Sequence, residues 1–315
     1  MEYVVGIDVG GQSSKLGVVD AQGNVIARSV IKADGCADPS VFVAGLAEGL
    51  KKLIPECGAD GMIRGIGVGA PNANYYSGCV GFAPNLPWAK DREVPFAKML
   101  SECLGGLPVT TTNDANAAAL GEMTYGVAKG IRHFIMITLG TGVGSGIVID
   151  GKLLYGADGF AGELGHTCAV RDSDRVCGCG KKGCLETYCS AIGVARTARE
   201  KLAACSEDSL LRSLPEISSK DVYDAAVKGD RVALEVFEFT GRILGENLAD
   251  FVAFSAPEAI VLFGGLARAK EFLYKPVLDA MNANLLPMWK GKVKLLFSAL
   301  KESDAAILGA SALAW

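Results

Sequence analysis

Residues 3–31 read YVVGIDVGGQSSKLGVVDAQGNVIARSVI, a stretch in which three apolar runs are separated by two turns. We expect strands at Tyr3–Val9, Lys15–Val19 and Asn24–Ile31, because each run contains β-branched residues and the turns at Gly10-Gly11 and Asp20–Gly23 separate them. Strand, turn, strand, turn and strand in this order predict a three-stranded antiparallel meander.

Residues 134–154 read FIMITLGTGVGSGIVIDGKLL and repeat this plan. Phe134–Leu139 predicts a strand, Gly140–Gly144 a glycine turn, Gly146–Ile149 a returning strand, and Asp150-Gly151 a tight turn before a third short strand. The repeat predicts two lobes built on one plan, each offering a glycine turn to the cleft between them. Backbone amides of such turns bind phosphates, so we expect a nucleotide site.

The bulk composition excludes several classes of protein. A chain of 315 residues, half of them hydrophobic and 40 of them Gly, suits two packed α/β domains. A net charge of -4 gives no broad basic surface for nucleic acid or acidic lipid, so we expect neither partner. The N-terminus lacks a positively charged signal segment, and no apolar run approaches the ~20 residues that span a bilayer, so we expect a cytoplasmic protein.

The remaining apolar periodicities predict further elements and a boundary between the lobes. The expected strands are Ile63–Gly69, Val109–Thr112, Ala259–Phe263 and Val293–Phe297, and the expected helices are Val41–Leu53, Phe96–Leu104, Leu185–Ala203, Ser219–Lys228, Asp230–Phe254 and Asp304–Trp315. We expect a small N-terminal lobe, residues 1–112, closed by the returning helix 304–315. Residues 113–303 then form a large lobe with a metal-binding loop.

Two carboxylates stand where strands meet turns or helices. Asp8 ends an apolar strand directly before Gly10-Gly11, and a carboxylate there can hold Mg²⁺ while glycine amides meet phosphate oxygens. Asp114 follows a strand and opens a helix, with Asn113 placed as the N-cap. A carboxylate at such a junction can accept a hydroxyl proton during phosphoryl transfer. The structural alternatives are an Asp that starts a β-turn and an acidic first turn that favours the helix dipole.

One imidazole and three thiolates predict a zinc site. His166, Cys177, Cys179 and Cys184 supply the number and type of ligands for a closed tetrahedral site. Gly178, Gly180 and Gly183 are expected to supply the bends that let the thiolates converge. We expect structural zinc, because four protein ligands leave no open position for catalysis.

Two more carboxylates lie close to these ligands in sequence. Glu163 precedes His166 by three residues, and Glu186 follows Cys184 by two. Zinc binding would hold both carboxylates near one point, where they can accept hydrogen bonds from sugar hydroxyls. The alternative is two exposed carboxylates in turns.

Taken together, these residues resemble the ROK family of sugar kinases, within the actin-like ATPase superfamily that includes hexokinases. The resemblance covers nearly the whole chain. Its motifs are Asp8-Val-Gly-Gly, Ala83-Pro-Asn85-Leu-Pro-Trp88, Asn113-Asp114-Ala-Asn116, Gly140-Thr-Gly-Val-Gly144, Glu163-Leu-Gly-His166, Cys177-Gly-Cys179-Gly-Lys-Lys-Gly-Cys184-Leu-Glu186 and Pro257-Glu-Ala-Ile-Val-Leu-Phe-Gly-Gly265.

The resemblance implies a duplicated, ribonuclease H-like α/β fold with two lobes around a nucleotide and sugar cleft. It implies that Asp114 deprotonates the sugar 6-hydroxyl for attack on the γ-phosphate of Mg-ATP. The implied sugar-binding residues are Gly69, Asn85, Asn113, Asp114, Glu163, His166 and Glu186. The implied ATP and Mg²⁺ residues are Asp8, Gly10, Gly11, Gln12, Ser13, Lys15, Thr141, Gly142, Gly264 and Gly265. We also expect a homodimer or homotetramer.

Two residues depart from the family pattern. Gln12 stands where Thr is usual in the first phosphate motif, although an amide can also donate to phosphate. Asn72 stands where Gly is usual after Gly69-Ala70-Pro71. We expect this second departure to affect the preference among sugars.

From this resemblance we expect glucose as the substrate, with N-acetylmannosamine or another hexose as the alternative. A sugar-responsive transcription repressor is a remote alternative, because the first strand leaves no room for a helix-turn-helix before it. A dinucleotide-binding dehydrogenase is rejected, because the turn at Gly140–Gly146 leads into a strand and not a helix.

Overall fold

The computed structural model describes residues 2–33 and 35–315. Contacts divide the chain into two compact units. Unit 1 comprises Met1–Ile131, Gly146–Gly162 and Ala299–Trp315, and unit 2 comprises Arg132–Ser145 and Glu163–Ser298. Among the described residues, no helix combines the length and the apolar character needed to cross a membrane.

Unit 1 is built on a five-stranded sheet in the order β3-β2-β1-β4-β7. β1 (Tyr3–Val9), β2 (Ser13–Asp20) and β3 (Val25–Lys32) pair antiparallel, which confirms the predicted meander. β4 (Ile63–Gly69) runs parallel to β1, and β7 (Val109–Thr112) runs parallel to β4, with the bounds that the sequence predicts.

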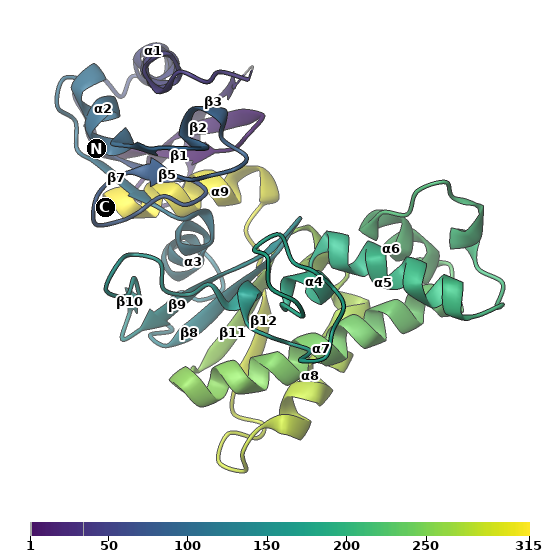
Figure 1. The fold of residues 1–315 in the computed structure, drawn as a ribbon. Coiled ribbons are helices and arrows are strands. Elements are labelled where there is room, and N and C mark those ends of the chain that lie inside the picture. The colour runs from purple at the N-terminus through teal and green to yellow at the C-terminus, as the bar shows by residue number, and fades with distance from the viewer. Residues whose placement is uncertain (1, 34) are drawn as a thin grey trace. The chain divides into compact units, whose positions relative to one another are not determined.

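The C-terminal helix packs on the sheet of unit 1. Figure 1 shows α9 (Glu302–Ser311), in yellow, beside the strands of the N-terminal sheet. The approach is close because two strand glycines face it: a Cβ at Gly6 would lie 2.0 Å from the Ile307 carbonyl oxygen, and one at Gly67 would lie 1.8 Å from that of Ala310. This contact confirms that the last helix returns to the first strands. The other elements of the unit are α1 (Pro39–Glu56), β5 (Val80–Gly81), β6 (Glu93–Val94), α2 (Phe96–Cys103) and α3 (Asp114–Thr124).

The compact units do not follow the division at residue 112 that the sequence suggested. α3 belongs to unit 1 because it packs on α9, where a Cβ at Gly121 would lie 2.9 Å from the Cα of Gly309. Residues 146–162 also belong to unit 1, so the division passes through β9. Two functional lobes bounded at residue 112 therefore stay a prediction.

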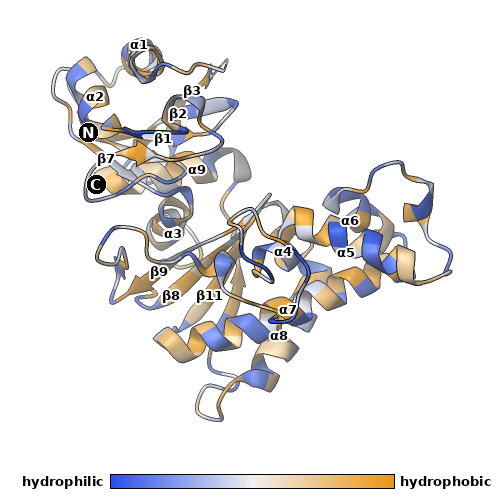
Figure 2. Cartoon of the chain, viewed as in Figure 1, coloured by the Kyte–Doolittle hydropathy of each residue, from blue (hydrophilic) through white to orange (hydrophobic). Residues whose placement is uncertain are grey.

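The second sheet repeats the first. Its order is β10-β9-β8-β11-β12, which matches β3-β2-β1-β4-β7 position by position. β11 is parallel to both β8 and β12, as β4 is to β1 and β7. Figure 2 shows β8 and β11 in the orange of apolar residues, as buried strands require. The strands are β8 (Phe134–Leu139), β9 (Val143–Ile149), β10 (Lys152–Leu153), β11 (Ala259–Phe263) and β12 (Lys294–Phe297).

The helices of unit 2 correct the sequence prediction at two places. The helix expected at 185–203 is broken at Ser190, whose hydroxyl caps the second part by accepting from Gly193 N at 3.0 Å. The helix that contains Pro276 was not predicted, and that internal proline weakens its helical pattern. The helices are α4 (Glu186–Cys189), α5 (Ala191–Ala204), α6 (Ser219–Val227), α7 (Arg231–Ser255) and α8 (Lys270–Asn284).

Candidate active site

The turn between β1 and β2 in unit 1 presents backbone amides to an anion. Gly10 N donates to Ser13 O at 3.1 Å and closes the turn. In the part of the chain that the structure describes, the next two amides, those of Gly11 and Gln12, have no protein acceptor. Consecutive free amides at a glycine turn bind phosphate oxygens. The predicted phosphate residues Gly10, Gly11, Gln12 and Ser13 therefore lie together.

Three strand ends of unit 1 form a row beside this turn. Asp8 on β1 pairs with Gly69 on β4, and Gly69 pairs with Thr112 on β7. Asn113 and Asp114 follow Thr112 directly. A Cβ at Gly69 would lie 3.7 Å from the Cα of Asp114, so the glycine lets the start of α3 approach the sheet. The row brings the predicted residues of β1, β4 and α3 to one edge, the carboxyl ends of parallel strands.

Asp8 has the environment of a cation ligand. Its side chain is 28% exposed, and the Lys15 ammonium lies 4.0 Å from its Oδ2. Burial raises the pKa of Asp8, Lys15 opposes this rise, and the nearby Asp114 carboxylate adds to it. Two neighbouring carboxylates suit a hard divalent cation such as Mg²⁺. Asp8 therefore fits the predicted magnesium role.

Asp114 stands at the N-terminus of α3. Asn113 caps the helix by accepting from Ala115 N at 2.8 Å, and the Oδ1 atom of Asp114 accepts from the same amide at 2.8 Å. Surrounding protein raises the pKa of Asp114 by desolvation, and the hydrogen bond from Ala115 partly opposes the rise. The residue is nevertheless exposed to solvent, so its carboxylate is accessible to a ligand. A carboxylate with a raised pKa at an accessible position suits a general base.

The loop that carries Asn72 and Asn85 is anchored by an aromatic core. Trp88 is 1% exposed and stacks on Phe42 and on Phe96, at centroid distances of 4.8 Å and 5.5 Å. Asn85 remains exposed, and its backbone carbonyl would lie 2.5 Å from a Cβ at Gly11. Asn72 has φ 53°, the left-handed conformation that explains why Gly is usual there. The predicted sugar-contacting Asn85 thus lies against the phosphate turn.

The corresponding turn of unit 2 also leaves two consecutive amides without a protein acceptor. Gly140 N donates to Gly142 O at 3.0 Å, Gly144 N donates to Thr138 Oγ1 at 3.1 Å, and Val143 N donates to Glu186 Oε2 at 3.0 Å. Among the described residues, the amides of Thr141 and Gly142 have no protein acceptor. Both turns therefore offer the same kind of phosphate site.

The predicted adenosine motif lies beside the turn of unit 2. β11 pairs with β8 in parallel, so Phe263 is opposite Thr138 at the ends of the two strands. Gly264 has φ 102°, and a Cβ there would lie 2.6 Å from the Leu139 carbonyl oxygen. Gly265 then begins a short 3-10 helix. The predicted residues Thr141, Gly142, Gly264 and Gly265 therefore gather at one sheet edge.

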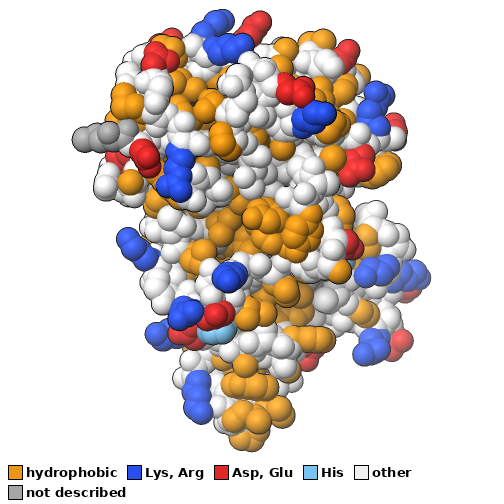
Figure 3. All heavy atoms as spheres, turned by 90° about the vertical axis from the view of Figure 1, so that its left-hand side faces the viewer, with side chains coloured by type: hydrophobic (Ala, Val, Ile, Leu, Met, Phe, Trp, Pro, Cys, Tyr) orange, Lys and Arg blue, Asp and Glu red, His pale blue; other side chains and the backbone are white. Residues whose placement is uncertain are grey.

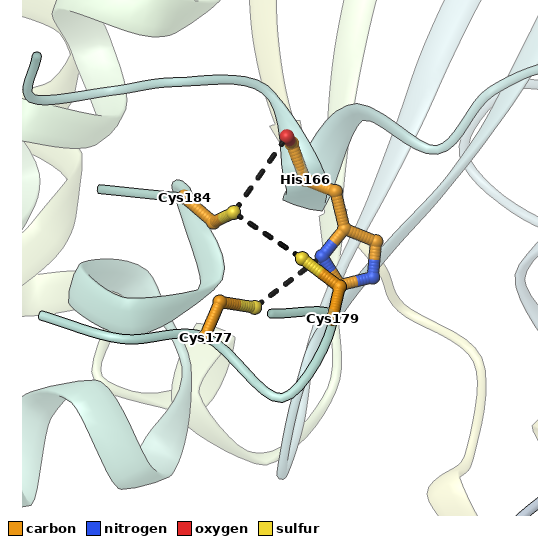
Figure 4. Close-up of side chains that lie close together, drawn as sticks. All are labelled: His166, Cys177, Cys179 and Cys184. Atoms are coloured by element: carbon orange, nitrogen blue, oxygen red, sulfur yellow. Dashed lines mark hydrogen bonds between the residues drawn. The ribbon is translucent and has the colours of Figure 1, made fainter. Parts of the chain in front are cut away.

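His166 and the three cysteines converge within unit 2, as Figure 4 shows. The potential ligand atoms of His166, Cys177, Cys179 and Cys184 all lie within 4.8 Å of one another. The Cys179 and Cys184 sulfurs are 3.7 Å apart, and the Cys177 sulfur is 3.5 Å from His166 Nδ1.

These separations fit zinc. Bonds of about 2.3 Å to sulfur and about 2.0 Å to nitrogen at tetrahedral angles put sulfurs about 3.8 Å apart and sulfur and nitrogen about 3.5 Å apart. Burial raises the pKa of the Cys177 thiol to about 12, an effect that a bound cation counters because it binds the thiolate. The donor set and its spacing match a structural zinc site.

The three expected glycine bends are present in the zinc loop. Gly180 and Gly183 have φ 87° and φ 73°, whereas Gly178 has no positive φ and open space around it. Gly178 is nevertheless the second residue of the β-turn that Gly180 N closes by donating to the Cys177 carbonyl oxygen at 2.9 Å, so all three glycines lie at bends of the loop. The Lys181 ammonium also donates a hydrogen bond to the His166 carbonyl oxygen at 2.8 Å, which connects the cysteine segment to His166.

The Glu163–His166 segment packs against β9, the strand that follows the phosphate turn. The Ser145 hydroxyl accepts from Leu164 N at 3.2 Å, and a Cβ at Gly165 would lie 1.9 Å from the Val143 carbonyl oxygen. Sequence reasoning missed Ser145 and also Thr138, which caps the turn through Gly144 N. The only sequence signal is a hydroxyl residue at each end of the glycine turn, and hydroxyls are common in such places.

Figure 3 shows Lys and Arg side chains dispersed among acidic ones over the face in view. This dispersion agrees with the near-neutral charge of the sequence. It provides no continuous basic surface on that face.

Comparison with known proteins agrees with the geometry. The ROK family profile matches residues 4–315. The chain is 35% identical to a glucokinase of Halalkalibacterium halodurans, over 98% of this chain and 93% of that protein, and 33% identical to a glucokinase of Thermotoga maritima, over 98% and 96%. The structure of a ROK family glucokinase from Streptomyces griseus, in complex with glucose and AMPPNP, matches with TM-score 0.79 and 31% identity, over 99% of this chain and 98% of that chain.

Two relatives named for other roles match over smaller parts of this chain. An N-acetylmannosamine kinase of Salmonella typhi is 34% identical over 68% of this chain, and a xylose repressor of Caldicellulosiruptor bescii is 32% identical over 80% of this chain and 62% of the repressor. The family profile and the relatives that match over the whole chain agree with the duplicated fold and the glycine turns. The protein belongs to the ROK family.

Proposed function

We propose that this protein is an ATP-dependent hexose kinase, with glucose as its substrate and glucose 6-phosphate as its product. The observation that carries the proposal is the row of strand ends, which puts Asp114 beside Gly69 and Asp8. The similarity to glucokinases over nearly the whole chain supports glucose as the sugar.

Asp114 acts as the general base in this proposal. Its carboxylate accepts the proton of the sugar 6-hydroxyl, and the hydroxyl oxygen then attacks the γ-phosphorus of ATP while ADP leaves. The raised pKa of Asp114 moves its proton affinity toward that of an effective base at neutral pH. The free amides of Gly11, Gln12, Thr141 and Gly142 bind phosphate oxygens. A bound Mg²⁺, held by Asp8, would neutralise phosphate charge.

The other predicted residues orient the sugar. Asn85 and Asn113 in unit 1 supply amide groups, and Gly69 leaves space at the end of β4. Glu163, His166 and Glu186 in unit 2 bind further hydroxyls. His166 can serve the sugar and the metal together, because its second ring nitrogen lies away from the three sulfurs in Figure 4.

The zinc has a structural role in this proposal. Four protein ligands fill a tetrahedral site, so the metal has no open position for substrate. It instead fixes the positions of His166 and Glu186. We further propose a cytoplasmic enzyme of glycolysis that works as a homodimer or homotetramer.

A coupled assay of ATP consumption across glucose, mannose, N-acetylmannosamine and N-acetylgalactosamine tests the proposal. We expect the highest kcat/KM with glucose. Phosphorylation of N-acetylmannosamine alone would replace glucose as the substrate and keep the kinase mechanism. Folded, zinc-loaded protein that phosphorylates none of these sugars would refute the kinase function.

A further inference from the structure

The carboxylate of Glu186 contacts the phosphate turn of unit 2 directly. Its Oε2 atom accepts the hydrogen bond from Val143 N at 3.0 Å. The Val143 amide follows the free amides of Thr141 and Gly142, so this bond fixes the turn next to the atoms that would meet phosphate. The proposed role of Glu186 as a sugar ligand does not require such a bond.

The lack of space beside Gly142 is a second observation that the Glu186 carboxylate packs against the turn. A Cβ at Gly142 would lie 2.4 Å from Glu186 Oε2, so any side chain at this position would displace the carboxylate. Gly142 thus leaves room for the Glu186 carboxylate to lie against the turn. The glycine has no positive φ that would require it for backbone reasons.

The segment that carries Glu186 connects the turn with the zinc loop. The other carboxylate oxygen, Oε1, lies 3.5 Å from the Cys177 sulfur, and Ala191 N donates to Gly140 O at 2.8 Å. The phosphate turn is therefore held at both ends by residues 186–191. These residues start two positions after the zinc ligand Cys184.

We infer that Glu186 is a positioning residue for the phosphate turn. Through this residue, the zinc loop sets the affinity of the turn for the nucleotide. The inference rests on the proposed function, because it assigns a second role to a carboxylate proposed to bind sugar. If one carboxylate serves both, an acceptor lost at position 186 weakens nucleotide binding even when no sugar is present. A residue that binds only sugar would not have this effect.

The first test measures Mg-AMP-PNP binding by calorimetry without sugar. Glu186→Ala should weaken binding about five- to tenfold, the effect expected from the loss of one typical hydrogen bond. Glu186→Gln should bind within about twofold of the wild type, because its amide oxygen can still accept from Val143 N. Unchanged binding in Glu186→Ala, or equal loss in both variants, would overturn the inference.

A control separates positioning from a general loosening of the zinc loop. Glu200 binds Arg175 close to that loop. Within the part of the chain that the structure describes, Glu200 has no contact with the phosphate turn. Glu200→Gln should therefore lower thermal stability and leave the affinity for Mg-AMP-PNP unchanged. A loss equal to that of Glu186→Ala would attribute the effect to loosening and refute the positioning role. Zinc content is measured for each variant, and Glu186→Ala should retain its metal.

A double-mutant cycle provides a second measurement. Gly142→Ala should weaken Mg-AMP-PNP binding in the wild-type background, because the new Cβ displaces the carboxylate. In the Glu186→Ala background the same change should cost less, since the displaced group is already gone. Additive losses would contradict the inference. A wild type that phosphorylates glucose but gives additive losses would leave the proposed function intact, whereas a wild type that binds no nucleotide would refute both.

Discussion

The Nδ1 atom of His166 lies 3.5 Å from the sulfur of Cys177, as expected of two ligands of one tetrahedral zinc ion. Cys177→Ser should therefore lose the metal and lower thermal stability, because a structural zinc contributes its binding energy to folding. Elemental analysis and thermal unfolding check this. The matched control is Cys168→Ser, an exposed cysteine outside the ligand cluster, which should keep about one equivalent of zinc.

A pair of glycines in the zinc loop should respond differently to a methyl group. Gly183→Ala places a Cβ 2.0 Å from the Val170 carbonyl oxygen at a φ of 73° and should cost about 3 kcal/mol or more, with loss of zinc. Gly178→Ala meets open space and should be nearly neutral. Denaturant unfolding and zinc content measure both variants. Equal losses would contradict the structure of this loop.

Removal of the proposed base should separate binding from turnover. Asp114→Asn keeps the shape of the side chain and loses its ability to accept a proton, so kcat should fall by about 10²- to 10⁴-fold. Glucose binding, measured by calorimetry, should change little. Near-normal turnover would remove Asp114 from the role of base.

The raised pKa of Asp114 has consequences for activity and for stability. Its causes are desolvation, which raises the pKa, and the Ala115 hydrogen bond, which partly opposes the rise. The base must be ionised, so kcat/KM should fall at low pH with a midpoint above the ordinary value of 3.8. A midpoint at or below that value in the measured pH profile would contradict the role.

The same shift predicts the direction of a stability change. A raised pKa means that the folded state binds the proton more tightly than the unfolded state does. This contribution to stability is complete below pH 3.8 and is lost as pH rises through the folded-state pKa. Asp114→Asn should therefore be more stable than the wild type at pH 7, and the difference should disappear in strong acid. Thermal unfolding at the two pH values measures it, and a less stable variant at pH 7 would contradict the shift.

Local sequence patterns predicted the strands well. The bounds of β4, β7, β8 and β11 are those expected from their β-branched runs, because a short buried run between turn residues has few alternatives. α8 was missed because Pro276 interrupts its pattern, and the helix forms since α7 packs along it. A Cβ at Gly245 of α7 would lie 2.4 Å from the Val277 carbonyl oxygen, which shows how closely the two helices pack.

The sequence by itself determined the duplicated plan and predicted the one imidazole and three thiolates that converge in the structure. Both predictions depend only on residue spacing, because a sequence repeat and a cluster of cysteines are local patterns. Only the tertiary structure decided that α3 packs with the first unit, that Asp8, Gly69 and Thr112 form one row, and that Glu186 bonds to Val143. The reason is physical: parallel pairing, close helix packing and the reach of one carboxylate join residues far apart in sequence, and no local pattern encodes the distance between them.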